Sequence, residues 1–175
     1  CVKYVSASNV AASPSTQGTD FFFSLMENGY KGNNTSNDTY TAIIAPKETG
    51  TVTFRYYANG TTVEHDVTKD VTLPVTLAEN LVYHDDPTSE AQRNRTVHVT
   101  SDVEISLYIA NEADNSFDAS IVLPTHALGN DYMIQTFPSN TNQGEDGRPC
   151  FMIIATEDDT PISISGAHSG DITPD

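Results

Sequence analysis

Several residue types are scarce in this chain of 175 residues, and each scarcity excludes a class of function. Only 8 Lys and Arg stand against 24 Asp and Glu, which gives a net charge of -16. Nucleic acids and anionic membranes are bound through Lys and Arg, so neither is an expected partner. No apolar run approaches the length of a membrane span. Tryptophan, a favoured residue for stacking on sugars, is absent.

Cysteine is almost as scarce. Cys1 and Cys150 are the two cysteines, too few for a four-ligand zinc site and too far apart for a CxxC redox motif. Three alternatives stay open for them: a disulfide within the chain, a disulfide between subunits, and a lipid on Cys1.

Thr, Ser and Asn supply most of the polarity, and they favour strands and turns. Short β-prone runs recur between turn signals, and the Asn59-Gly60 pair is a strong hairpin signal. Pro74 places its own run at a sheet edge or a bend. The pattern predicts an all-β, β-sandwich-like fold, with strands at 21–25, 40–45, 52–57, 62–68, 71–77, 97–100, 105–110, 119–123, 132–137, 151–156 and 162–164.

Three short sequence matches recur in order at a nearly constant offset. The chain therefore reads as one and a half copies of a β-rich unit, with residues 18–57 repeated at 129–164. An incomplete second copy predicts an unpaired sheet edge that a donated strand would complete.

The first 17 residues are expected to lie apart from the domain formed by residues 18–175. They contain a strand-like segment, 2–12, followed by a Ser- and Pro-containing linker. We expect this segment to act as a donor strand whose apolar side chains set the register, namely Val2, Tyr4 or Val5, and Val10.

N-x-[ST] triplets indicate a secreted or cell-surface protein, because glycan acceptors must lie on exposed loops. The candidate acceptors are Asn33, Asn34, Asn37, Asn59 and Asn94.

Catalytic and metal motifs are weak. The five His residues lack metal-ligand spacing, and no GxSxG motif is present, so we expect no enzyme and no resident cofactor. Acidic turns are the one place where a calcium ion would find oxygen ligands, although none has the spacing of a dedicated loop. The candidates are Asp114, Asp118, Asp158 and Asp159.

Ordered motifs between residues 18 and 164 resemble the N-terminal domain of the IgGFc-binding protein family. The most specific are VLPT at 122–125 with LGNDY at 128–132, and IATEDDT at 154–160. The resemblance implies an extracellular β-rich module for adhesion, matrix or binding. It does not carry over Fc binding.

The sequence therefore predicts a non-enzymatic extracellular module with a structural or adhesive role. In this hypothesis the subunits join into a homo-oligomer or filament through the N-terminal strand. The alternative is a domain that binds a glycan or a protein through its loops, with or without calcium.

Overall fold

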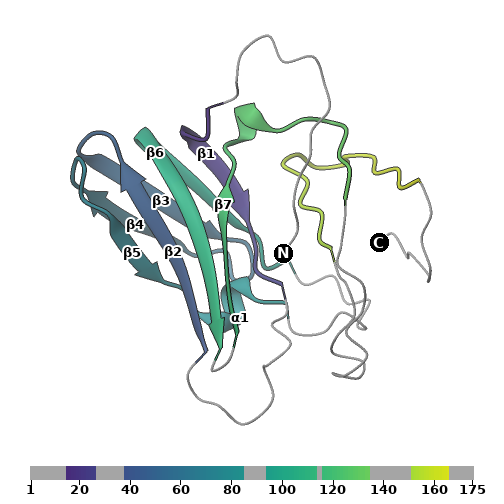
Figure 1. Ribbon diagram of the computed structural model, residues 1–175, viewed down its shortest axis with the longest axis horizontal. Helices are drawn as coiled ribbons and strands as arrows, with labels where there is room; N and C mark the ends of the chain where they lie inside the picture. The colour runs from purple at the N-terminus through teal and green to yellow at the C-terminus, as the bar shows by residue number, and fades with distance from the viewer. Residues whose placement is uncertain (1–14, 27–37, 85–93, 114–115, 135–150, 166–175) are drawn as a thin grey trace.

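The computed structural model describes residues 15–26, 38–84, 94–113, 116–134 and 151–165. Within these ranges seven antiparallel strands form one curled sheet, which confirms the prediction of an all-β fold (Figure 1). Helical structure is confined to two single turns in the described part. The elements are β1 (Gly18–Phe23), β2 (Thr39–Pro46), β3 (Gly50–Tyr56), β4 (Thr62–Val67), β5 (Leu73–Thr76), α1 (Glu79–Val82), β6 (Val97–Ala113), β7 (Ser116–Val122) and η1 (Thr125–Ala127).

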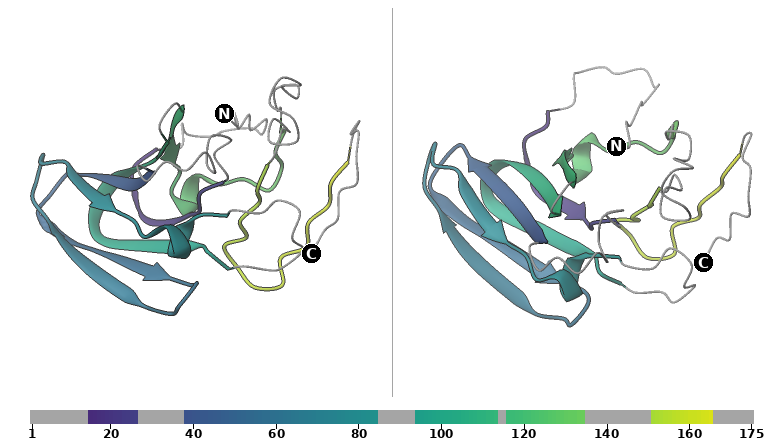
Figure 2. Two further views of the ribbon diagram at one scale, coloured as in Figure 1. Left: turned by 90° about the horizontal axis from the view of Figure 1, so that it is seen from below. Right: turned by 60° about the horizontal axis from the view of Figure 1, so that its bottom comes forward.

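The 17-residue strand β6 organises the sheet because it is paired along both sides. Residues 97–101 lie between β3 and β1, and residues 105–113 lie between β2 and β7. We call β4, β3, β1 and residues 97–101 the first half-sheet. The second half-sheet contains β5, β2, β7 and residues 105–113. The sheet curls between them, so that its two halves share one concave side (Figure 2).

Side-chain alternation fills that concave side. In β1, Phe21 and Phe23 are 0% and 2% exposed, whereas Phe22 lies on the opposite face and is half-buried. One apolar cluster contains residues of both half-sheets, such as Phe54 of β3 and Ile44 of β2. A period of two along β2 and β3 thus separates the core from the outer face.

The hairpin predicted at Asn59-Gly60 is present between β3 and β4. Gly60 has a φ of 72°, a conformation that favours glycine. The side-chain oxygen of Asn59 accepts hydrogen bonds from the backbone N–H and the hydroxyl of Thr61, at 3.0 and 2.7 Å. Pro74 lies in β5, which pairs only with β2, so its predicted edge position is also confirmed.

Two buried polar groups close the end of the core near α1. The hydroxyl oxygen of Ser24 lies 3.0 and 3.1 Å from the carbonyl oxygens of Val82 and Arg95, either of which can accept its hydrogen bond. Tyr40 packs against Tyr83 with ring centroids 5.0 Å apart. Burial, reinforced by the charge of Glu79, raises the pKa of Tyr40 well above its usual range, so its hydroxyl stays protonated in the folded protein.

The last described segment, residues 151–165, contains no strand. In the sequence repeat this segment corresponds to β2 and β3, but its backbone does not form strands as theirs does. The strands predicted at 151–156 and 162–164 are therefore not formed. The repeat of residues 18–57 at 129–164 stays a prediction from the sequence. The domain division at residue 17 also stays a prediction, because residues 1–14 lie outside the described ranges.

Candidate binding face

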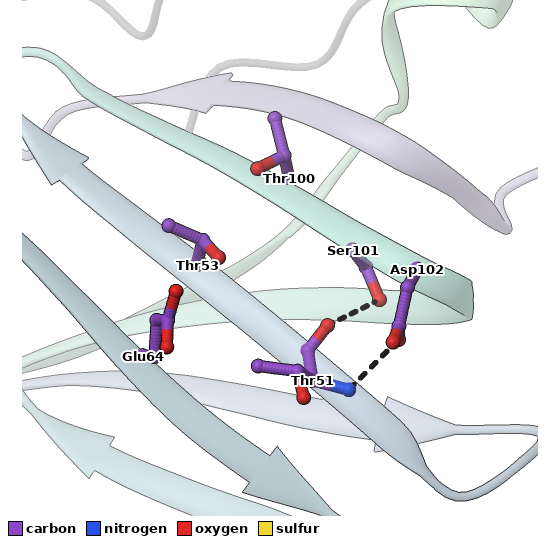
Figure 3. Close-up of a pocket in the computed structure, with 6 residues that line it drawn as sticks. All are labelled: Thr51, Thr53, Glu64, Thr100, Ser101 and Asp102. Atoms are coloured by element: carbon purple, nitrogen blue, oxygen red, sulfur yellow. Dashed lines mark hydrogen bonds between the residues drawn. The ribbon is translucent and has the colours of Figure 1, made fainter.

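The outer face of the first half-sheet carries an open depression of about 460 Å³. Three adjacent strands supply its lining, and every lining side chain is polar (Figure 3). The lining residues are Thr51 and Thr53 of β3, Glu64 of β4, and Thr100, Ser101 and Asp102 of β6.

Strand register brings these side chains together. Thr53 stands opposite Glu64 on one side and opposite Thr100 on the other, so the three form a row across the sheet. Val52 and Phe54, the neighbours of Thr53 along β3, point into the core and are fully buried. The alternation that builds the core therefore also fixes which hydroxyls face solvent.

One end of the depression is held by hydrogen bonds to the start of β3. The carboxylate of Asp102 accepts a hydrogen bond from the backbone N–H of Thr51 at 2.7 Å. The hydroxyl of Ser101 donates to the carbonyl of Thr51 at 3.4 Å (Figure 3). Asp102 and Ser101 are thus engaged in the fold, whereas no described residue hydrogen-bonds the side chains of Thr53, Glu64 or Thr100.

Aromatic and charged groups border the same face. Phe22 of β1 stacks on His98 of β6, with ring centroids 4.1 Å apart and planes 8° from parallel. The imidazole Nε2 of His98 lies 3.2 Å from a carboxylate oxygen of Asp20. The guanidinium of Arg55 lies 5.0 Å from the centre of the Tyr57 ring. Phe22, His98 and Arg55 form the next row of the outer face, on one side of the row that contains Thr53 and Thr100.

This face offers a ligand hydrogen-bonding groups and negative charge. Threonine hydroxyls both donate and accept, and carboxylates accept from cationic groups. Among the described residues His98 is paired with Asp20 and stacked on Phe22, and no serine or threonine hydroxyl is hydrogen-bonded to it.

Of the predicted glycan acceptors, Asn59 and Asn94 are described and both are exposed. The carboxamide oxygen of Asn94 accepts a hydrogen bond from the backbone N–H of Thr96 at 3.4 Å. The remaining acceptors, the two cysteines and the donor-strand residues lie outside the described ranges, namely Asn33, Asn34, Asn37, Cys1, Cys150, Val2, Tyr4, Val5 and Val10. These assignments stay predictions.

The calcium candidates are likewise untested. Asp118 is exposed in β7, Asp158 and Asp159 are exposed in a turn, and Asp114 lies outside the described ranges. No group of three or more His, Cys, Asp or Glu side chains that could hold a metal occurs among the residues that the structure describes. The candidate binding face instead involves residues that the sequence did not single out, and its central row is Thr53, Glu64 and Thr100.

The described residues also contain no helix long and apolar enough to cross a membrane. A search of curated proteins finds no match to this chain. A solved structure titled "Crystal Structure of Thermotoga maritima 1070" is similar at 17% sequence identity, over 59% of this chain and 91% of that chain, with a TM-score of 0.35. Residues 118–175 match the family model described as IgGFc binding protein, which confirms, over that segment, the family that the sequence motifs resemble.

Proposed function

We propose that this chain is a non-enzymatic extracellular binding module that takes a segment of another protein on the outer face of its first half-sheet. The observation that carries the proposal is the open depression lined by polar side chains from three paired strands. The family match supports a protein ligand, because the family description names protein binding. A rigid sheet also holds such groups at fixed spacing without any cost of ordering a loop.

The negative charge of this face favours a ligand segment that contains Lys or Arg. Glu64 and Asp102 lie in the depression, and Asp20 and Asp66 lie on the same outer face. The whole chain carries a charge of -16, so long-range attraction favours a cationic partner. Side chains of Thr53 and Thr100 would then hydrogen-bond the ligand beside the charged contact.

A charge reversal in the central row tests this assignment. We expect Glu64→Lys to weaken binding of a Lys-rich peptide at least about tenfold, a loss of about 1.4 kcal/mol. Isothermal titration calorimetry at moderate salt gives the dissociation constants, and circular dichroism checks that the fold is kept.

The matched control is Glu112→Lys, an exposed charge reversal on the second half-sheet. It changes the net charge without touching the depression. If Glu112→Lys, which changes the net charge by the same two units, weakens binding as much as Glu64→Lys does, attraction to net charge explains the binding and the site is wrong. Binding to glycans but not to any peptide would favour the alternative, a glycan-binding domain.

Assembly through the N-terminal strand is a second candidate role, favoured by the open edge strands of the described sheet. Residues 2–12 of one copy would add to a sheet edge of the next copy, with Val2, Tyr4 or Val5, and Val10 setting the register. Such contacts repeat head to tail and produce filaments.

Deletion of residues 1–12 tests this second role. We expect the intact chain to form species larger than a dimer in light scattering, and the deletion to remove all of them. A deletion variant that still forms these species would contradict strand donation. Val5→Pro removes a backbone donor within the segment and tests the same strand donation by a single substitution.

A further inference from the structure

The two edges of the curled sheet differ in how they are protected. One edge, β4 and β5, carries Glu64, Asp66 and Pro74, the kind of residues that discourage pairing with another chain. The other edge includes β7, whose sequence SFDASIV contains a single charged residue, Asp118. No described residue pairs with β7 on the side away from β6.

The middle of β7 is exposed to solvent. Residues 117–120 are all exposed, and Phe117 is 66% exposed. A strand with a free edge and an exposed phenylalanine is a template for adding another strand. The occupant has to satisfy both the backbone groups of the edge and this apolar side chain.

We propose that β7 pairs antiparallel with β7 of a second copy, centred on Ala119. In an antiparallel pair, residues directly opposite one another point to the same face. A twofold axis at Ala119 places Phe117 opposite Ile121 of the second copy, and Asp118 opposite Ser120. The first pair is apolar, the second matches a carboxylate with a hydroxyl, and all seven residues of β7 are used.

Neighbouring twofold registers are worse for clear reasons. Centring the pair on Asp118 sets two carboxylates directly opposite each other, which is repulsive. Centring it on Ser120 sets Asp118 opposite Val122 and leaves Phe117 beyond the end of the partner strand. The strand is therefore self-complementary in one register only.

The outer face of the second half-sheet supports the same register. Pro74, Ile43, Tyr108 and Ile121 form one row across four strands, because each is the direct pairing partner of the next. Tyr108 is 41% exposed. In the dimer, Phe117 of the second copy extends this row beyond Ile121, so an apolar strip crosses the twofold axis and both copies lose exposed apolar area.

Cysteine cross-linking tests the contact and its register. In a background with Cys1→Ser and Cys150→Ser, Ala119→Cys brings two thiols together at the axis. Directly opposite Cα atoms of antiparallel strands lie about 4.5–5.5 Å apart, within the range of a disulfide. We expect this variant to run as a covalent dimer on non-reducing gels and to return to monomer on reduction.

Two controls fix the register. Phe117→Cys alone and Ile121→Cys alone put each thiol about 13 Å along the strand from its copy in the partner, so neither should cross-link. The combination of both should cross-link. Dimers from either single variant but not from Ala119→Cys would overturn the register.

Charge substitution gives a readout without cysteine. Ala119→Lys sets two ammonium groups opposite each other, and we expect it to raise the dimer dissociation constant at least about tenfold in analytical ultracentrifugation. Ala119→Thr, a neutral strand former, should leave the constant within about threefold. The proposal is overturned if the two variants dimerise equally, or if the chain with intact β7 and residues 1–12 deleted is a monomer throughout. Deletion of residues 1–12 leaves β7 unchanged. Loss of filaments in that variant therefore tests strand donation and not the β7 contact.

Discussion

Replacing Phe54 with alanine is expected to lower the free energy of unfolding by about 3–5 kcal/mol. Phe54 is fully buried in β3, with the ring of Phe23 at 6.4 Å edge-on and that of His65 at 5.2 Å edge-on. Its removal leaves a cavity between β1, β3 and β4 that these rigid strands cannot close. Urea denaturation followed by circular dichroism measures the loss.

Phe22→Ala is the matched control for this prediction. It removes the same side chain from the same sheet, but from the outer face, where Phe22 is half-buried and stacks on His98. We expect a loss of about 1–2 kcal/mol. Equal losses for the two variants would mean that the concave side is not the principal core.

Local signals in the sequence predicted the hairpin and one edge of the sheet. Asn59-Gly60 specifies a tight turn through a glycine at positive φ, and alternation on both sides of it specifies the flanking strands. Pro74 lacks a backbone donor, which fixes β5 as an edge strand. Each of these features depends on a few neighbouring residues, so a single sequence is enough.

The length of β6 was predicted incorrectly, although its signal was present. The sequence pattern places residues 97–100 and 105–110 in separate strands, with the largely polar residues 101–104 between them. Val97, Val99, Ile105 and Leu107 are all fully buried, and all are odd-numbered. The alternation therefore keeps its phase through the polar stretch, as one continuous strand requires.

The proposed binding face could not have been predicted from the sequence. Thr53 and Thr100 lie 47 positions apart, and they meet because β3 pairs with β6 in one particular register. Register between distant strands is set by the packing of the whole core rather than by local composition. The same limit applies to residues 151–165, whose sequence resembles β2 and β3 but which lack a pairing partner among the described residues.

Replacing Gly50 with alanine is expected to cost about 2–3 kcal/mol, the upper part of the range for overpacking. Gly50 begins β3 where the sheet bends, and a Cβ there would lie 2.3 Å from a carboxylate oxygen of Asp102 and 2.8 Å from a methyl of Val103. That carboxylate oxygen cannot move freely, because it accepts the hydrogen bond from Thr51. Gly60→Ala, where a Cβ meets nothing within 4 Å, should cost only about 1–2 kcal/mol through its positive φ.

A double-mutant cycle separates the steric contact from a general effect of losing glycine. Asp102→Ala removes the clashing oxygen but also the hydrogen bond to Thr51, so it is destabilising by itself. Combined with Gly50→Ala, it should cost less than the two single losses added, by about 1 kcal/mol, because the double variant no longer has the oxygen that clashes with the new Cβ. If the two losses measured by urea denaturation simply add, the steric contact between position 50 and Asp102 is contradicted.

Since Asp102 also lines the depression, Gly50→Ala should weaken binding of the Lys-rich peptide, whereas Gly60→Ala should leave that affinity unchanged.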